Sequence, residues 1–139
     1  MARGASGKEK AQARGVTFTF DTGMLVALER RKRRATDAFR NIVRLGFLPI
    51  VPAVVYAEWW RGRTVLREAI LAAVVVEDMP PLLCRAAGEA LAAVSGATLA
   101  DAVVMASAAL RGGGVVYTGD LQDLRRLQRH FSTVLVLEA

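Results

Sequence analysis

The sequence predicts an α/β fold with a mostly parallel sheet of four or five strands. Short runs of β-branched and aromatic residues alternate with stretches of helical periodicity along the chain after the first fifteen residues. The apolar runs of the expected strands are continuous instead of alternating, which is typical of strands covered by helices on both faces. With 139 residues and 53% hydrophobic content, the chain can form one domain around a single core.

The first segments are expected to be an arm, a strand and a helix. Residues 1–15 are polar and basic without periodicity, so we expect a disordered basic arm ahead of a domain over 16–139. The β-branched and aromatic run at 16–20 predicts a strand that ends at Asp21. A helix is expected over 23–34, with apolar residues on one face and a run of basic residues at its end.

The next segments repeat this alternation. Thr36 is expected to cap a second helix, and Gly46 closes it, because glycine readily adopts the conformation that ends helices. An apolar run then predicts a strand at 47–51. Pro52 fits the first turn of a third helix over 52–60, since this position needs no backbone donor.

The middle of the chain continues with a helix, a strand and a longer helix. A fourth helix is expected over 64–71, and it leads into a third strand at 73–76. Pro80 and Pro81 favour the start of a fifth helix, which Gly96 ends.

The last segments complete the sheet. Thr98 is expected to cap a sixth helix over 99–110, which a triple glycine ends. A fourth strand follows at 115–118, a short helix at 121–128 and a last strand at 133–137.

Composition excludes several classes of protein. The net charge of +6 and the sequence pI of about 10.4 favour a polyanionic partner, such as nucleic acid or an acidic protein segment. No apolar run has the roughly 18 residues of a membrane span, and the N-terminus does not resemble a secretory signal, so we expect a cytoplasmic protein. The single cysteine, Cys84, excludes an internal disulfide, and with one histidine, His130, there is no zinc site. We expect Cys84 in the core and His130 on the surface.

Four acidic residues lie where a solvated acid has no need to lie. Asp21 and Asp120 follow the first and fourth expected strands, and ligand sites of parallel sheets form at the carboxyl ends of strands. Glu58 and Asp101 each share a helix face with apolar residues. A half-buried carboxylate is costly unless it is paired or bound to a cation.

Each of these acids also has a simpler interpretation, which the sequence leaves open. Asp101 can complete a capping box with Thr98, Asp120 can be a turn residue, and Asp21 can be an N-cap. Glu58 can pair with one of two nearby arginines. Four such coincidences at one end of a sheet favour a shared cause, a divalent cation that removes the mutual repulsion of the carboxylates. Oxygen-only ligands indicate Mg²⁺ or Mn²⁺, which can activate water and clamp phosphate oxygens.

These residues, in this order, resemble the PIN domain, and specifically the VapC-type toxins of toxin–antitoxin pairs. The segments that carry the resemblance are Phe20-Asp21-Thr22-Gly23, Val55-Tyr56-Ala57-Glu58, Leu99-Ala100-Asp101-Ala102 and Thr118-Gly119-Asp120-Leu121-Gln122-Asp123-Leu124. The resemblance covers nearly everything after residue 15. The chain departs from the family pattern in its basic arm and in Gly23, where another small residue is common.

The resemblance implies a three-layer α/β/α sandwich in which the first strand lies beside the fourth. It implies a catalytic and metal-binding quartet, a further metal-binding acid and a supporting hydroxyl. These are, in turn, Asp21, Glu58, Asp101 and Asp120; Asp123; and Thr118. Family members are Mg²⁺- or Mn²⁺-dependent endoribonucleases that commonly form homodimers and are inhibited by a cognate antitoxin.

The predicted function is therefore metal-dependent hydrolysis of RNA by a toxin whose partner is a VapB-like antitoxin. The substrate class is tRNA, rRNA or mRNA, and DNA cleavage by the same site stays open because this chemistry needs no 2′-hydroxyl. RNA contacts are expected from Arg61, Arg63 and Arg125, with the basic run 30–34 as a further candidate or as a solvated helix end. A PIN-like binding module without activity, acting through its antitoxin, is the alternative. A receiver-like phosphoryl-transfer domain lacks support, because the paired acids and the lysine that it needs are missing.

Overall fold

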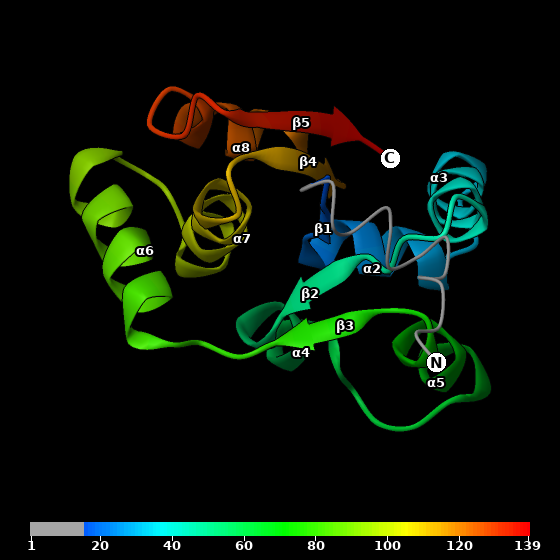
Figure 1. The fold of residues 1–139 in the computed structure, drawn as a ribbon. Coiled ribbons are helices and arrows are strands. Elements are labelled where there is room, and N and C mark those ends of the chain that lie inside the picture. Colours follow the sequence, from blue (N-terminus) through cyan, green and yellow to red (C-terminus); the bar gives the residue numbers. More distant parts are fainter. Residues whose placement is uncertain (1–15) are drawn as a thin grey trace, which may run out of the picture.

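A parallel five-stranded sheet with helices on both faces forms the part of the chain that the structure, a computed structural model, describes, residues 16–139 (Figure 1). The arm expected at 1–15 lies outside the described residues. The strands are β1 (Phe18–Phe20), β2 (Ile50–Pro52), β3 (Val75–Glu77), β4 (Gly114–Thr118) and β5 (Val134–Glu138). The helices are α2 (Thr22–Glu29), α3 (Arg33–Arg44), α4 (Ala53–Trp59), α5 (Val65–Ala72), α6 (Pro81–Ala93), α7 (Leu99–Leu110) and α8 (Leu121–Gln128).

The strand order β3-β2-β1-β4-β5 determines where the helices lie. The connections from β1 to β2 and β3 run in one direction along the sheet, and those from β3 to β4 and β5 run in the other. Because such crossovers are right-handed, the helices of the two sets cover opposite faces. In Figure 1, α3 and α5 accordingly lie on one side of the sheet and α6 and α7 on the other. The predicted α/β class and the placement of β1 beside β4 are both confirmed.

The core is centred on α7, which is buried on nearly all sides. Its residues from Ala102 to Ala108 are inaccessible or nearly so, and the helix packs on the sheet and against α6 and α8. Four of these seven residues are alanine or serine, and such small side chains let neighbouring helices approach closely. The short α4 contacts both α2 and α7, so it holds its side chains at the carboxyl ends of β1 and β2.

Threonine caps explain why two helices begin where the sequence predicts. The hydroxyl of Thr98 accepts from the Asp101 amide at 3.2 Å, and that of Thr64 accepts from the Arg67 amide at 3.0 Å. Each satisfies an amide that has no partner within its helix.

The helix expected over 23–34 is wrong at its end, because α2 stops at Glu29. Arg31 adopts φ +55°, and its amide and that of Lys32 donate to the carbonyls of Leu28 and Ala27, both at 3.0 Å. This is the hydrogen-bond pattern that ends helices at glycine, formed here by an arginine at a cost of about 1 kcal/mol. Nothing in a run of basic residues indicates such a stop.

Three smaller expectations are also corrected. Thr36 does not cap a helix, because α3 already begins at Arg33 with Lys32 at the N-cap. Pro52 ends β2 and precedes α4 instead of occupying its first turn. Cys84 is exposed on α6, where Leu83 and Ala87 are buried, while His130 is exposed as expected.

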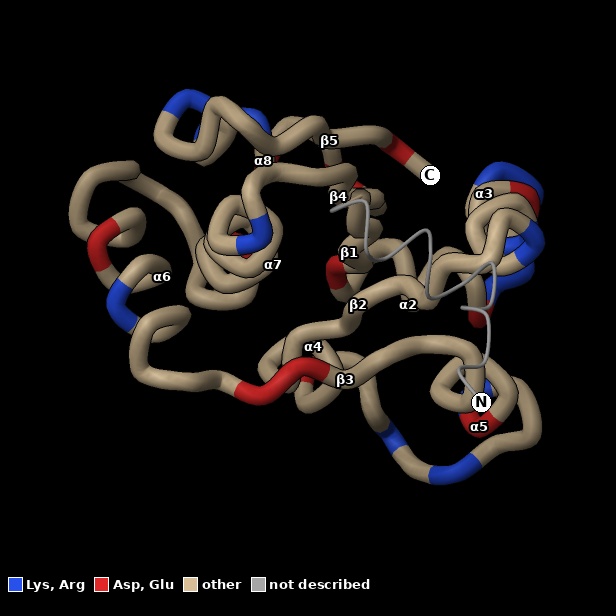
Figure 2. The backbone as a smooth tube through the Cα atoms, viewed as in Figure 1, with Lys and Arg blue, Asp and Glu red and all other residues tan. Residues whose placement is uncertain are grey.

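Charge is distributed unevenly over the helices. The outer helix α3 carries four arginines and a single acid, Asp37, and Figure 2 shows it as the most strongly basic element.

Among the described residues, no helix is both long and apolar enough to cross a membrane.

Candidate active site

The site lies at the carboxyl ends of β1 and β4, which are neighbours in the sheet. The Asp21 amide donates to the Tyr117 carbonyl at 3.2 Å, which continues the pairing of the two strands one residue beyond β1. Asp21 is then the N-cap of α2, and Asp120 is the N-cap of α8. The topology thus brings together two aspartates that are 99 positions apart in the sequence.

Asp21 is held by three donors in a buried environment. Its Oδ1 accepts from the Met24 amide at 2.7 Å and from the Gly119 amide at 3.3 Å, and its Oδ2 accepts from the Thr118 hydroxyl. The residue is only 7% exposed. The Thr118 hydroxyl also accepts from the Asp120 amide at 2.9 Å, so it links both aspartates.

A contact between Gly23 and Gly119 lets the backbone segments that carry Asp21 and Asp120 lie close together. A Cβ atom on Gly119 would lie 2.8 Å from both Cα and C of Gly23, and one on Gly23 would lie 2.9 Å from Cα and N of Gly119. Real Cβ atoms do not approach backbone so closely, and backbone cannot move aside as a side chain can. Gly23, a departure from the family pattern, is therefore explained by its packing against the turn that carries Asp120.

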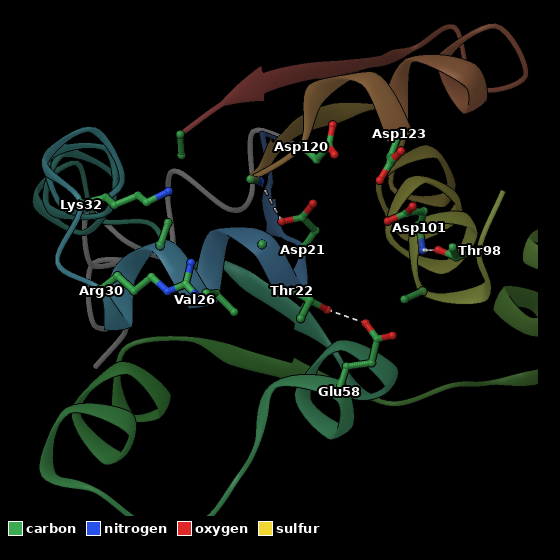
Figure 3. Close-up of a pocket in the computed structure, with 15 residues that line it drawn as sticks. Asp21, Thr22, Val26, Arg30, Lys32, Glu58, Thr98, Asp101, Asp120 and Asp123 are labelled. Atoms are coloured by element: carbon green, nitrogen blue, oxygen red, sulfur yellow. Dashed lines mark hydrogen bonds between the residues drawn. The ribbon is translucent and has the colours of Figure 1, made fainter. Parts of the chain in front are cut away.

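One cavity of about 330 Å³ gathers all five predicted acids. Figure 3 shows Asp21 near its centre, with Asp120 and Asp123 at the start of α8, Asp101 from α7 and Glu58 from α4 around it. The acids of the quartet and the fifth acid therefore share one space, although they come from four separate segments.

The simpler interpretations hold for some of these acids and fail for one. Asp21 and Asp120 do cap helices, since Asp120 Oδ1 accepts from the Gln122 amide at 3.1 Å. Glu58 does not pair with an arginine, because its Oε1 accepts from the Thr22 hydroxyl at 2.6 Å. No local pattern indicates this contact, which joins residues 36 positions apart.

No family model matches the sequence, and no curated protein matches it. A chain in the crystal structure of VapBC2 from Rickettsia felis, bound to a DNA fragment from its promoter, aligns with a TM-score of 0.69 and 10% identity, covering 89% of this chain and 99% of that chain. A chain of DNA-bound VapBC from Salmonella typhimurium aligns with a TM-score of 0.65 and 15% identity, covering 88% and 98%. The chain has a PIN-like fold.

Within the PIN-like fold, two of the acids are unfavourable as free anions. Burial raises the pKa of Asp21 to about 6, and its three hydrogen bonds only partly oppose this effect. Burial also raises the pKa of Asp101, and the negative charges of Asp123, Glu58 and Asp120 add to the rise. A cation in the cavity would relieve both effects.

The residues of the cavity fit a hard divalent cation rather than zinc. Every candidate ligand is a carboxylate, and neither Cys84 nor His130 lines the cavity. Within residues 16–139, no three Asp, Glu, His or Cys side chains are placed so that they could hold one ion directly. Mg²⁺ commonly keeps several waters and takes only one or two carboxylates as direct ligands, which is compatible with this spread-out arrangement.

The arginines predicted to contact RNA do not line the cavity of the PIN-like fold. Arg61 donates to the Trp60 carbonyl at 2.7 Å, and Arg63 Nε lies 3.4 Å from Glu68 Oε1. Arg125 lines a different hollow beside β5. Two other cationic residues, Arg30 and Lys32, do line the cavity, at the side opposite Asp101.

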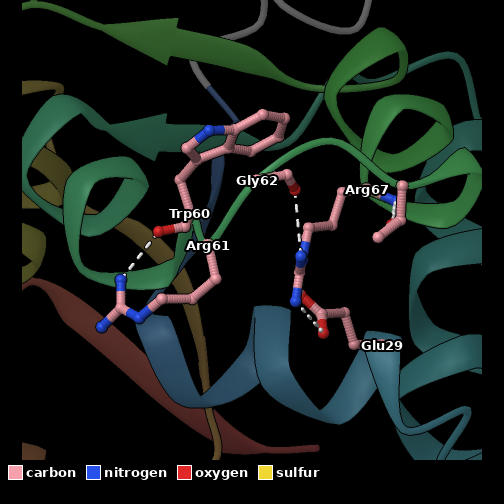
Figure 4. A network of polar contacts seen from close by, with 6 residues as sticks. Glu29, Trp60, Arg61, Gly62 and Arg67 are labelled. Carbon is pink, nitrogen blue, oxygen red and sulfur yellow. Dashed lines mark hydrogen bonds and ion pairs between the residues drawn. The ribbon is translucent and has the colours of Figure 1, made fainter.

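Hydrogen bonds of Arg67 hold the segment with Arg61 and Arg63 against α2. The Arg67 guanidinium makes two contacts with Glu29, at 2.7 and 3.3 Å, and donates to the Gly62 carbonyl at 2.9 Å (Figure 4). These bonds to Glu29, near the end of α2, raise the pKa of Arg67, which stays charged. The sequence did not indicate this network.

Proposed function

We propose that the chain is a Mg²⁺- or Mn²⁺-dependent endoribonuclease of the VapC type. The observation that carries the proposal is the gathering of five carboxylates in one cavity at the carboxyl ends of β1 and β4, with Asp21 buried at its centre. Such a cavity is costly without a cation and suits the binding of a phosphodiester next to one.

The partner follows from the same resemblance. The matched structures are VapBC complexes bound to DNA, and this chain covers nearly the full length of each matched chain. We propose a VapB-like antitoxin as the partner of this chain and a homodimer as its own assembly. The acidic cavity and the arginines of α3 offer surfaces of opposite charge to such a partner.

The side chains have separable roles in the proposed reaction. Asp21 and Asp101 gain most from a cation, because their charged forms are disfavoured in its absence. Asp120, Asp123 and Glu58 would complete the negative surround. A bound Mg²⁺ or Mn²⁺ would supply an activated water and neutralise charge on the phosphate.

Two threonine hydroxyls orient carboxylates of the proposed site. Thr118 fixes the Asp21 carboxylate by donating its hydroxyl to Oδ2. Thr22 fixes Glu58 by donating to Oε1, and we assign this exposed carboxylate the role of taking up the proton of the attacking water.

Cleavage of a pooled tRNA and rRNA preparation tests the proposal. The protein, freed of antitoxin, is incubated with Mg²⁺, with Mn²⁺ or with EDTA, beside Asp21→Asn, Asp101→Asn and the control Asp78→Asn, whose side chain is exposed and outside the cavity. Discrete cuts that need metal, persist in the control and disappear in the two cavity variants are expected. Folded protein that cuts nothing with either metal would instead favour the binding module without activity. A single-stranded DNA substrate in parallel decides whether cleavage is restricted to RNA.

A further inference from the structure

The acidic cavity has a basic wall formed by Arg30 and Lys32. Both residues line the cavity, and Figure 3 shows their side chains extending from the segment between α2 and α3 toward the acids. Asp101, Asp120 and Asp123 lie on the opposite side. The cavity therefore has a negative and a positive side, with Asp21 between them.

The end of α2 explains why these two cations face the same way. Arg31 adopts the left-handed conformation with φ +55°, which reverses the chain between its neighbours. Arg30 and Lys32 consequently line the acidic cavity, whereas Arg31 lines a separate hollow between α2, α3 and α5. A continued helix would have separated the two cations by about 200° around its axis.

Neither cation is neutralised by a partner in the described part of the chain. Arg33, Arg63, Arg67 and Arg111 form ion pairs within residues 16–139, but no carboxylate there lies within 4 Å of Arg30 or Lys32. Two cations that share a cavity with five carboxylates yet pair with none of them are available to a bound anion.

The distance between the acids and the two cations fits the binding of two phosphates of one nucleic-acid strand. Asp21 caps the start of α2 and Arg30 caps its end, nine positions apart, which corresponds to about 13 Å along the helix axis. The long side chains of Arg30 and Lys32 shorten this distance as they reach toward the acids. The cations are thus within one or a few nucleotides of a phosphate held at the acids.

We propose that Arg30 and Lys32 bind a backbone phosphate flanking the scissile one, and so set the direction in which the RNA strand crosses the cavity. The proposal rests on the proposed function, because it takes RNA as the substrate. Arg30 and Lys32 act as positioning residues, since the acids carry the chemistry.

Binding without cleavage tests the proposal. A fluorescent single-stranded RNA is titrated in EDTA with the wild type, with Arg30→Ala/Lys32→Ala, and with Arg85→Ala/Arg129→Ala, which removes the same charge from exposed sites outside the cavity. The first variant should bind about tenfold more weakly at low salt than the control variant. The slope of log affinity against log salt should become shallower by about 0.7 for each phosphate that the variant no longer neutralises. Arg30→Lys/Lys32→Arg should restore the slope.

Cleavage kinetics separate this proposal from the function on which it rests. The Arg30→Ala/Lys32→Ala variant should show a raised KM with kcat nearly unchanged, and Mg²⁺ should raise its Tm as much as that of the wild type. Equal affinity and slope for the two double variants, with RNA still cleaved by the wild type, would overturn this proposal alone. Wild-type protein that neither binds nor cleaves RNA would overturn the proposed function together with it.

Discussion

Replacing the buried Asp21 carboxylate by an amide, through Asp21→Asn, should stabilise the metal-free protein at neutral pH. Burial raises the pKa of Asp21 from 3.8 to about 6 in the folded protein. The unfolded chain therefore ionises first, so stability falls as the pH rises from about 4 through 6 and is lowest above that range. The amide carries no charge and escapes this loss.

The magnitude follows from the shift in pKa. A shift of about two units at roughly 1.36 kcal/mol per unit corresponds to about 3 kcal/mol in the free energy of unfolding at pH 7. The amide can keep the cap, because its oxygen can accept from the Met24 amide as Oδ1 does. The Thr118 hydroxyl can then donate to the Asp120 carbonyl, 3.1 Å away, and accept from the new amide.

Urea unfolding in EDTA at pH 7 and at pH 4.5 measures this effect. Asp21→Asn should be about 3 kcal/mol more stable than the wild type at pH 7, with most of the difference gone at pH 4.5. Asp78→Asn serves as the control and should show little difference at either pH. An Asp21→Asn variant that is less stable than the wild type at pH 7, or whose gain is the same at both pH values, would refute the reasoning.

Three other changes have defined outcomes. Gly119→Ala forces a Cβ against the Gly23 backbone and should cost about 1–3 kcal/mol in urea unfolding, whereas Gly88→Ala, which meets nothing within 4 Å on α6, should stabilise by about 0.5–1 kcal/mol. An equal effect of the two would contradict the close contact. Arg67→Ala frees Gly62 and Glu29, so trypsin should cut after Arg61 and Arg63 faster than in the wild type, and unchanged cutting would count against the network. Thr118→Val removes a donor to Asp21 and should move the acidic limb of the cleavage pH profile upward, while an unmoved limb would show that this bond has no such role.

The sequence predicted best those elements that local signals define. The helix at 99–110 and the helix at 121–128 were predicted with their observed bounds, because side chains cap them and glycine or a loop ends them. The stop of α2 could not be predicted, since it depends on a left-handed arginine where glycine is usual. Cys84 was placed in the core from its apolar neighbours, but the helix turns it outward.

The same distinction holds for the candidate site. The acids were predictable because strand ends and helix faces are local patterns, and the topology then brings Asp21 and Asp120 together. Contacts between distant segments left no local pattern: the Thr22 hydroxyl on Glu58, the Gly23–Gly119 approach and the turn of Arg30 and Lys32 toward the cavity. The arginines that the sequence placed beside Glu58 are instead turned to other partners.

Calorimetric titration of the protein with Mg²⁺, and separately with Mn²⁺, tests the proposed metal site most directly. Saturable binding at pH 7 is expected in the wild type and in Asp78→Asn, with binding strongly weakened in Asp101→Asn and reduced at pH 5, where Asp21 is protonated. A folded wild-type protein that binds neither ion, or Asp101→Asn protein that binds as tightly as the wild type, would contradict a metal site in this cavity.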